Sequence, residues 1–334
     1  MNHLKKFNKI KLYVGAMSKI CVDSVIDCEE IDKSKIGFIS SRRQIDYDKG
    51  YVNNWTTSEF SNYVKSKNQN LIICRDHGGS GQGKTDDNGI LSYEEDSKNF
   101  DLIHVDPWKK YSNYDDGLEK TVEAIKRIYK LNNNVYFEVG TEESIRPFSE
   151  NELLTFLKDL KTKLTNPEFS KIAYCVIQSG VGLDLINQKN TGKFDKKRLK
   201  AMIEICNEFR ILSKEHNADY LNLEQFKERF ELGLHAINIA PEIAQIETNV
   251  YLENIKTQSS FEKLYSLCLK SNKWKKWVDQ SFDLNDKRKL IEVCCHYVFS
   301  SNEFLVFSRE VEIEAKTRIQ NKILNFIKVC DIIE

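Results

Sequence analysis

The sequence predicts a (β/α)8 barrel of residues 1–255, followed by a helical C-terminal extension of residues 256–334. Short apolar segments alternate with helical segments about eight times along the first part of the chain, which is typical of a parallel barrel. Polar side chains follow most of the apolar segments, at the strand ends where barrel enzymes place their active sites. A doubly wound open sheet is the alternative. No G-x-G-x-x-G motif separates the first strand from the first helix, which weighs against a dinucleotide fold.

Each of the first four units joins an apolar run to a helix. Ser18 and Thr56 supply N-caps for the first two helices. Residues 71–74 form an unbroken apolar run, as expected of a strand buried on both faces. The glycine-rich segment 78–88 is too long for a simple turn, and we interpret it as a binding loop or lid. The predicted strands are 10–17, 36–40, 71–74 and 100–106, and the predicted helices are 18–34, one starting at 56, 92–99 and 114–131.

The last four units include one weak strand, residues 218–222. Ser149 caps one helix, and Pro241 suits the first turn of another. Beyond residue 255 only helical segments remain (261–269, 285–298 and 310–329), and no linker rich in Pro, Gly or Ser marks an independent domain. The predicted strands are 135–142, 172–177, 218–222 and 235–239, and the predicted helices are 149–164, 195–215, 223–232 and 241–255.

Composition narrows the choice of partner and compartment. Lys plus Arg and Asp plus Glu both number 50, so the formal charge is zero and favours a small ligand over nucleic acid. The nine cysteines form no C-x-x-C pair and lie in apolar runs, which predicts reduced core thiols. No signal-like or membrane-length apolar segment is found, and we expect a cytoplasmic protein with no membrane partner.

The strand ends supply the candidate catalytic groups. Asp76 and His77 follow the third strand, although Asp76 could instead cap a turn and His77 bond a loop. Glu138 and Glu142 share a strand face, so Glu138 would lie deeper and need a buried partner such as His104. His104 and His216 fit structural and functional roles equally.

A phosphate site is predicted from basic and glycine residues. Arg42, Arg43 and Lys84 could bind a phosphate through their cationic groups, and the glycines from Gly78 to Gly83 through backbone N–H groups. The alternative is that Arg42 and Arg43 pair with Asp46 and Asp48, and that Lys84 is solvated.

Taken in order, the strand-end motifs resemble those of a known family. It is the tagatose-bisphosphate aldolase subunit usually called non-catalytic (GatZ/KbaZ-like), within the class II aldolase group of barrels. The similar motifs are Gln44, Gly50-Tyr51, Asp76-His77-Gly78, His104-Val105-Asp106, Gly140-Thr141-Glu142, Gln178-Ser179-Gly180, Glu215-His216, Asp219-Tyr220, Ala240-Pro241 and, in the C-terminal part, Trp274-Lys275 and the region of Tyr297.

This resemblance implies metal-dependent cleavage or formation of a carbon–carbon bond in a ketose phosphate. It implies that Asp76 transfers the proton, that His77 binds the metal and that Asn238 contacts a substrate oxygen. Where the catalytic relatives carry further metal-binding histidines, near the ends of the sixth and seventh strands, this sequence offers Gln178 and Asn222. A ligand set with one histidine and several oxygens favours Mn²⁺, Mg²⁺ or a weak zinc site, and the absence of any metal stays open.

The function expected from the sequence is a metal-dependent lyase or epimerase that uses retro-aldol chemistry on a sugar or sugar phosphate. The cofactor is a divalent metal, Zn or Mn. The alternatives are a non-catalytic partner subunit that stabilises a separate aldolase, and a sugar-binding barrel without turnover. The expected protein partner is a second copy of the chain or a catalytic aldolase subunit. The candidate residues are Asp76, Glu138 and Asn238 for catalysis, His77, Asp106, Glu142 and Gln178 for the metal, and Arg42, Arg43, Gln44, Gly78, Gly79, His104, Ser179, Gly180 and His216 for the substrate.

Overall fold

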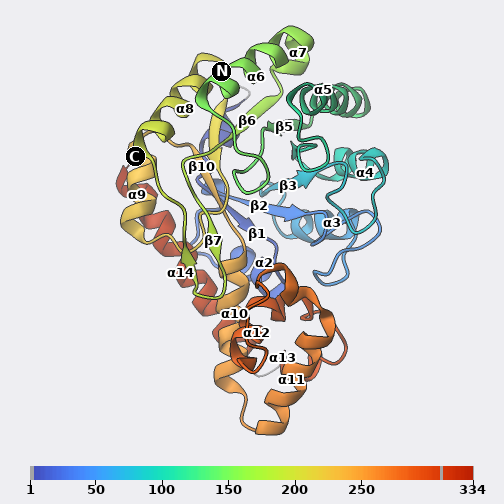
Figure 1. Ribbon diagram of the computed structural model, residues 1–334, viewed down its shortest axis with the longest axis vertical. Coiled ribbons are helices and arrows are strands. Elements are labelled where there is room, and N and C mark those ends of the chain that lie inside the picture. Colours follow the sequence, from blue (N-terminus) through green and yellow to red (C-terminus); the bar gives the residue numbers. More distant parts are fainter. Residues whose placement is uncertain (1–3, 309–310, 334) are drawn as a thin grey trace.

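In a computed structural model, which describes residues 4–308 and 311–333, eight parallel strands close into a barrel (Figure 1). The strand order is β1-β10-β9-β6-β5-β4-β3-β2, and β1 pairs with both β2 and β10. The predicted (β/α)8 barrel is therefore confirmed. The barrel strands are β1 (Leu12–Gly15), β2 (Ile36–Ser41), β3 (Ile72–Gly78), β4 (Leu102–Val105), β5 (Tyr136–Val139), β6 (Ile172–Ile177), β9 (Leu212–Glu215) and β10 (Ala236–Ile239).

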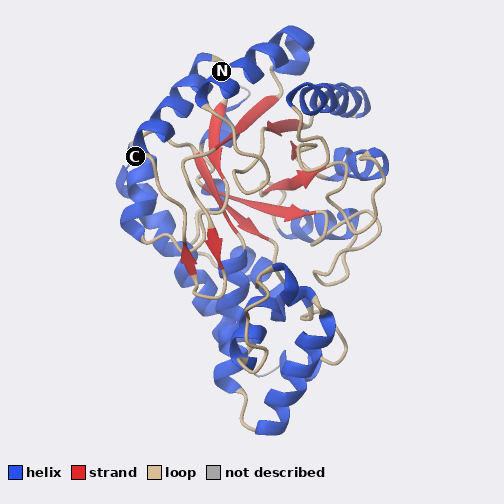
Figure 2. Cartoon of the chain, viewed as in Figure 1, coloured by secondary structure: helices blue, strands red, loops and turns tan. Residues whose placement is uncertain are grey.

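Helices surround this barrel, as the secondary-structure colouring in Figure 2 shows. The expected caps are present: Ser18 accepts a hydrogen bond from the Cys21 N–H at 2.8 Å, and Thr56 forms a capping box with Glu59. Within the described residues, no helix has both the length and the apolar character needed to cross a membrane. The helices of this part are α1 (Lys5–Asn8), α2 (Lys19–Asp27), α3 (Thr57–Lys67), α4 (Ile90–Asn99), α5 (Tyr114–Leu131), α6 (Glu150–Lys163), α7 (Asn166–Phe169), α8 (Lys196–Glu208), α9 (Leu223–Glu231) and α10 (Pro241–Asn254).

The seventh barrel strand lies elsewhere than predicted. The predicted helix 195–215 ends at Glu208, the strand is β9 (Leu212–Glu215), and residues 218–222 form no strand. The error has a physical cause, because Lys214 and Glu215 look like surface residues in the sequence but are both 0% exposed. Buried ion pairs compensate their charges: Lys214 pairs with Glu138 at 2.6 Å, and Glu215 with Arg229 at 2.8 Å.

Smaller differences concern element ends. The helix predicted to reach residue 34 ends at Asp27, and a 3₁₀ turn, Lys33–Lys35, precedes β2. Strand β3 continues through the charged residues to Gly78. A two-stranded hairpin, β7 (Leu183–Asp184) with β8 (Lys189–Asn190), interrupts the loop after β6, and its strands are too short to be read from periodicity.

The barrel interior is closed at the end where the strands begin. Helix α1 lies there and buries Phe7, whose carbonyl accepts a hydrogen bond from the Tyr174 hydroxyl at 2.7 Å. Tyr174 meets Tyr13 edge to face inside the barrel, with ring centroids 5.8 Å apart. All nine cysteines are buried, as predicted for thiols of the core.

The C-terminal segment has two parts. Helices α11 (Gln258–Ser271), α12 (Lys287–Cys294) and α13 (Leu305–Ser308) form a lobe beside α10, with its own apolar core (Figure 1). Helix α14 (Glu312–Ile333) then returns to pack against α2, α9 and α10, where Phe326 stacks on Phe226 at 4.4 Å. Glu310, the predicted start of this last helix, lies outside the described residues. The division of the chain at residue 255 stays a prediction.

Candidate active site

A bulge at the end of β3 brings Asp76 and His77 to the same place. Adjacent residues of a regular strand point to opposite faces. Here the pairing of β3 with β4 shifts register between Arg75 and Gly78, and His77 adopts a left-handed backbone with φ 43°. Such bulges re-aim side chains, and both residues line one cavity as a result. The strained conformation of His77 is held in place by His104, whose Nδ1 accepts the His77 N–H at 3.3 Å.

Three histidines meet at the carboxyl ends of the strands. His77 comes from β3, His104 from β4, and His216 directly follows β9. Their ring centroids are 5.2 Å (His77–His104), 5.4 Å (His77–His216) and 5.1 Å (His104–His216) apart. The correction of the seventh strand is decisive, because it places His216, and not Asn222, at that strand's end.

His77 keeps one ring nitrogen exposed to the carboxylates of the cavity. Its Nδ1 lies 2.5 Å from Oδ2 of Asp106. Its Nε2 lies 3.5 Å from Oδ1 of Asp76 and 3.6 Å from Oε2 of Glu142. Burial alone lowers the pKa of His77, but Asp76, Asp106 and Glu142 together raise it well above its ordinary value. The surroundings therefore favour a positive charge at this point.

A carboxylate also holds one ring nitrogen of His216, in this case from inside the barrel. Its Nε2 lies 2.6 Å from Oε1 of Glu138, while its Nδ1 faces Oδ1 of Asp76 at 3.7 Å. The second oxygen of Glu138 accepts a hydrogen bond from Lys214 at 2.6 Å. Burial raises the pKa of Glu138, but Lys214, His104 and His216 outweigh it and lower that pKa overall. Glu138 is thus an ionised group that orients His216 from inside the barrel.

Glu142 completes the convergent set. Its Oε2 accepts a hydrogen bond from Asn217 at 2.6 Å, and its other oxygen accepts one from Ser144. Burial opposes the charge of Glu142, but His77 and His216 lower its pKa well below the ordinary range. Asp76 lines the cavity, and its Oδ1 makes no hydrogen bond within the described residues; Oδ1 of Asn238 on β10 also makes none, but Asn238 is not among the residues that line the cavity. Buried polar atoms without partners are rare, and in a cavity they point to a ligand.

Several groups of these side chains could hold a metal ion. The ligand atoms of His77, Glu142 and His216 lie within 4.8 Å of one another, and the same holds for Asp76, His77 and His104 and for His104, Glu138 and His216. His104 has both ring nitrogens engaged, since its Nε2 lies 3.0 Å from the Gly140 carbonyl oxygen. In His77 and His216, by contrast, a carboxylate holds one nitrogen and the other nitrogen faces Asp76, and metal-binding histidines are usually oriented by a carboxylate in this way. His77, Glu142 and His216, with Asp76 beside them, therefore fit a divalent cation best.

Asp76, His77 and Glu142 line a cavity of about 570 Å³, whereas His216 is buried and is not among its lining residues. Asp76, His77, Glu142 and Asn217 line it from the barrel, and so do Arg43 and Gln44 from the segment after β2. This volume is within the usual range for small-molecule sites.

Gln178 and Ser179, predicted for the metal and the substrate, are bonded elsewhere. The Gln178 amide oxygen accepts hydrogen bonds from the Phe148 N–H and from Arg198, both at 3.1 Å. Its NH₂ group donates to the carbonyls of Thr141 and Arg146, both at 2.9 Å, so no lone pair remains for a metal. Ser179 donates to the buried carboxylate of Glu215. Gly180 has φ 86° and allows a close approach of the Lys193 carbonyl.

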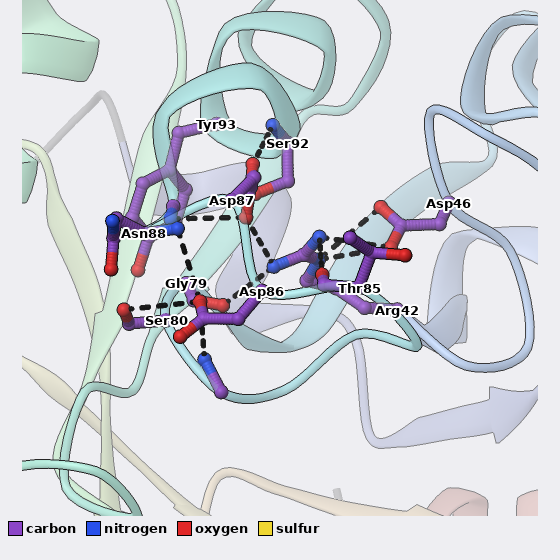
Figure 3. A network of polar contacts seen from close by, with 12 residues as sticks. Arg42, Asp46, Gly79, Ser80, Thr85, Asp86, Asp87, Asn88, Ser92 and Tyr93 are labelled. Carbon is purple, nitrogen blue, oxygen red and sulfur yellow. Dashed lines mark hydrogen bonds and ion pairs between the residues drawn. The ribbon is translucent and has the colours of Figure 1, made fainter.

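Arg42 is an internal support of the loop after β3 (Figure 3). It is 1% exposed, and its guanidinium contacts Asp46 at 3.0 Å, Asp87 at 2.7 Å and the Gly79 carbonyl at 2.8 Å. The alternative given for Arg42, pairing with Asp46, is therefore present, and Arg42, predicted to bind substrate, does not line the cavity. The Gly78 carbonyl accepts a hydrogen bond from Tyr93 at 2.9 Å.

The glycine-rich loop is filled by its own carboxylate. Asp86 accepts hydrogen bonds from the N–H groups of Gly81 and Asn88 at 3.1 and 3.0 Å, and pairs with Lys110 at 2.6 Å (Figure 3). The bond from Lys110, with these N–H donors, lowers the pKa of Asp86 to about 2. Asp86 thus accepts hydrogen bonds from N–H groups that a bound phosphate would need, and Lys84 is not among the residues that line the cavity.

Sequence reasoning missed several residues of the site. Lys214 was hidden by the misplaced helix. Asn217 and Lys109 lie in loops without a recognisable motif. Lys276 and His296 line the cavity from the C-terminal lobe, and no sequence pattern connects that lobe to the strand ends.

Comparison with known proteins supports the fold. No protein-family model matches this sequence, and no curated protein sequence matches it. Among solved structures, the chain is similar to a probable tagatose 6 phosphate kinase from Sinorhizobium meliloti 1021, with 12% identity over 96% of this chain and 97% of that one and a TM-score of 0.69. The YdjI aldolase from Escherichia coli K12 has 15% identity over 98% and 93%, with a TM-score of 0.60. The fructuronate-tagaturonate epimerase UxaE from Cohnella laeviribosi has 10% identity over 96% and 81%, with a TM-score of 0.65. At these identities the likeness establishes a barrel shared with aldolases and epimerases.

Proposed function

We propose that this protein is a metal-dependent lyase or epimerase that acts on a ketose or ketose phosphate by retro-aldol chemistry. The observation that carries this proposal is the pair His77 and His216. Each has one ring nitrogen held by a carboxylate at 2.5–2.6 Å and directs the other toward Asp76 and Glu142. Similarity to aldolase and epimerase barrels is consistent with this proposal, but a barrel fold alone does not determine a reaction.

The ligand set fits a divalent transition metal. His77, His216 and Glu142 would hold the ion, and two imidazoles with a carboxylate suit Zn²⁺ or Mn²⁺. Such an ion supplies a Lewis acid that polarises a ketose carbonyl. Asp106 and Glu138, predicted for the metal and for catalysis, act in this proposal as the carboxylates that orient the two histidines.

Asp76 carries the proton in this proposal. Its Oδ1 makes no hydrogen bond within the described residues and lies at the cavity floor, so it can accept the proton of a substrate hydroxyl. As that hydroxyl becomes an aldehyde, the adjacent carbon–carbon bond breaks and its electron pair moves into the ketose fragment as an enediolate. Asp76 returns the proton when the bond re-forms, and attack on the opposite aldehyde face gives the epimer. Asn238, whose amide oxygen makes no hydrogen bond to any residue that the structure describes, is proposed to hold a substrate hydroxyl.

A second candidate is a non-catalytic partner subunit of a separate aldolase. The specific observation in its favour is Gln178, which stands at the end of the sixth strand with every hydrogen-bonding position of its amide used. Failure to retain an aldolase subunit in a pull-down with the full chain would argue against it. Cytoplasmic location and self-association likewise remain proposals.

Elemental analysis of the purified protein tests the main proposal. We expect about one divalent ion per chain, lost in His77→Ala and in His216→Ala. Asn222→Ser is the matched control, because the sequence places Asn222 where the structure has His216. Serine can still cap α9, and this variant should keep the metal. Retention of the ion by His216→Ala, or no ion in the wild type after incubation with Zn²⁺ and Mn²⁺, would contradict the proposed site. If the ion is present as expected, turnover of ketose phosphates is measured next on the metal-loaded protein.

A further inference from the structure

The C-terminal lobe forms one wall of the active-site cavity. Lys276, Trp277, His296 and Tyr297 line the cavity together with the barrel residues Asp76 and Glu142. The lobe is fastened to the loop after β2, because Ser300 donates a hydrogen bond to the Tyr51 carbonyl at 2.8 Å and accepts one from the Asn53 N–H at 2.6 Å. The Tyr51 and Tyr297 rings also pack with centroids 4.8 Å apart.

Three cationic side chains from separate segments line this cavity. Arg43 follows β2, Lys109 follows β4, and Lys276 belongs to the lobe. Within residues 4–308 and 311–333, none of the three has a carboxylate within ion-pair distance, unlike Arg42, which has two. Desolvation of the ammonium group, followed by the charge of Arg43, lowers the pKa of Lys109, and the same causes lower that of Lys276 to about 8, while Glu142 offsets part of the lowering in both. The cations thus repel one another, and a bound anion would relieve that repulsion.

His296 adds a buried ring nitrogen, Nδ1, to the cavity wall. It is 1% exposed, lines the cavity, and its Nδ1 makes no hydrogen bond within the described residues. Burial and the neighbouring Lys276 lower the pKa of His296 to about 3, so the ring is neutral. A neutral imidazole can donate to or accept from a sugar hydroxyl.

We propose that Arg43, Lys109 and Lys276 bind the terminal phosphate of a ketose phosphate, with His296 contacting a hydroxyl of the same substrate. Three unpaired cations match a phosphate dianion better than a single carboxylate. The substrate then spans the cavity, with its phosphate at the rim and its reacting carbons at Asp76, His77 and Glu142. The lobe is therefore a specificity element of the barrel. The identity of the substrate rests on the proposed function, whereas phosphate binding at the rim does not.

Calorimetric titration tests this site directly. Inorganic phosphate is titrated into the wild type, Lys276→Gln and Lys275→Gln, with the metal removed by a chelator. Lys275 is an exposed neighbour on the same turn and does not line the cavity, so it serves as the matched control. We expect Lys276→Gln to weaken phosphate binding by about tenfold or more, Arg43→Gln to do the same, and Lys275→Gln to leave it unchanged. Equal affinity in Lys276→Gln and Lys275→Gln, or no binding to the wild type, would overturn the site.

Kinetics separates this inference from the proposed reaction. If ketose phosphates are turned over, Lys276→Gln should raise KM far more than it lowers kcat, because the phosphate contact is made in ground state and transition state alike. Turnover that is insensitive to Lys276→Gln would overturn the phosphate site and leave the reaction standing. Phosphate binding without turnover of any ketose phosphate would remove the reaction and leave the site. Binding of hexuronates but not of phosphates would overturn the assignment of the rim to phosphate.

Discussion

Nε2 of His216 lies 2.6 Å from Oε1 of Glu138, and this contact links the three histidines at the strand ends to the ion pair inside the barrel. Glu138 in turn pairs with Lys214, which has its ammonium 3.7 Å from the Tyr13 ring centroid. A chain of polar contacts from Lys214 through Glu138 to His216 therefore runs from the barrel core to the site.

Breaking this buried pair from one side should be costly. We expect Lys214→Met to lower the free energy of unfolding by about 3–5 kcal/mol, because it leaves the Glu138 carboxylate buried without its cation. Denaturant unfolding measures the loss. The double variant Lys214→Met with Glu138→Gln should recover most of it. A double variant no more stable than the single one would show that the packing of Lys214, and not its charge, supports the barrel.

Asp106 is expected to set metal affinity through His77. Asp106→Asn retains the size of the side chain but weakens the hold on His77 Nδ1, and metal affinity should fall by roughly 10–100-fold. Competition with a chromogenic chelator gives the affinity. Asp48→Asn, in an exposed loop, is the control and should bind as the wild type does. Unchanged affinity in Asp106→Asn would show that the ion binds elsewhere.

Glu247 should make stability depend on pH. Burial raises the pKa of Glu247 to about 7 from an ordinary value near 4.5. Between these values the folded protein holds a proton that the unfolded chain releases, so Glu247 makes stability fall as pH rises from about 4.5 to about 7. We expect Glu247→Gln to be more stable than the wild type above pH 7, by on the order of 1–3 kcal/mol, with little difference near pH 4.5. Thermal unfolding across this range measures the difference. An advantage that is independent of pH would contradict the assignment.

The packing of α14 on the barrel can be tested with two residues of that helix. Phe326 is 0% exposed and stacks on Phe226, whereas Ile332 is 76% exposed. We expect Phe326→Ala to cost about 3–5 kcal/mol of unfolding free energy and Ile332→Ala to change it little. Similar values for the two variants in denaturant unfolding would show that α14 contributes no core to the barrel.

The sequence could predict those parts of the fold that obey simple periodicity. Residues 114–131 have apolar side chains at helical spacing, and α5 has those same bounds. β9 could not be predicted, because Lys214 and Glu215 are buried by partners distant in sequence, and periodicity treats charge as exposure. The contact between His77 and Asp106 could be predicted from the sequence, because the two residues stand at the carboxyl ends of neighbouring strands. The positions of Lys276 and His296 in the cavity wall could not be predicted, because only the folding of the C-terminal lobe brings these residues to the strand ends.

Helix α14 also constrains how the molecule can fold during synthesis. It packs beside α2, and the hydrogen bond from Gln320 to the Ser24 carbonyl joins residues 296 positions apart in the chain. Contacts of such sequence separation form late and slowly. The helices around β1 thus wait for nearly the whole chain to leave the ribosome, and until then the apolar face of α2 is a natural target for chaperones.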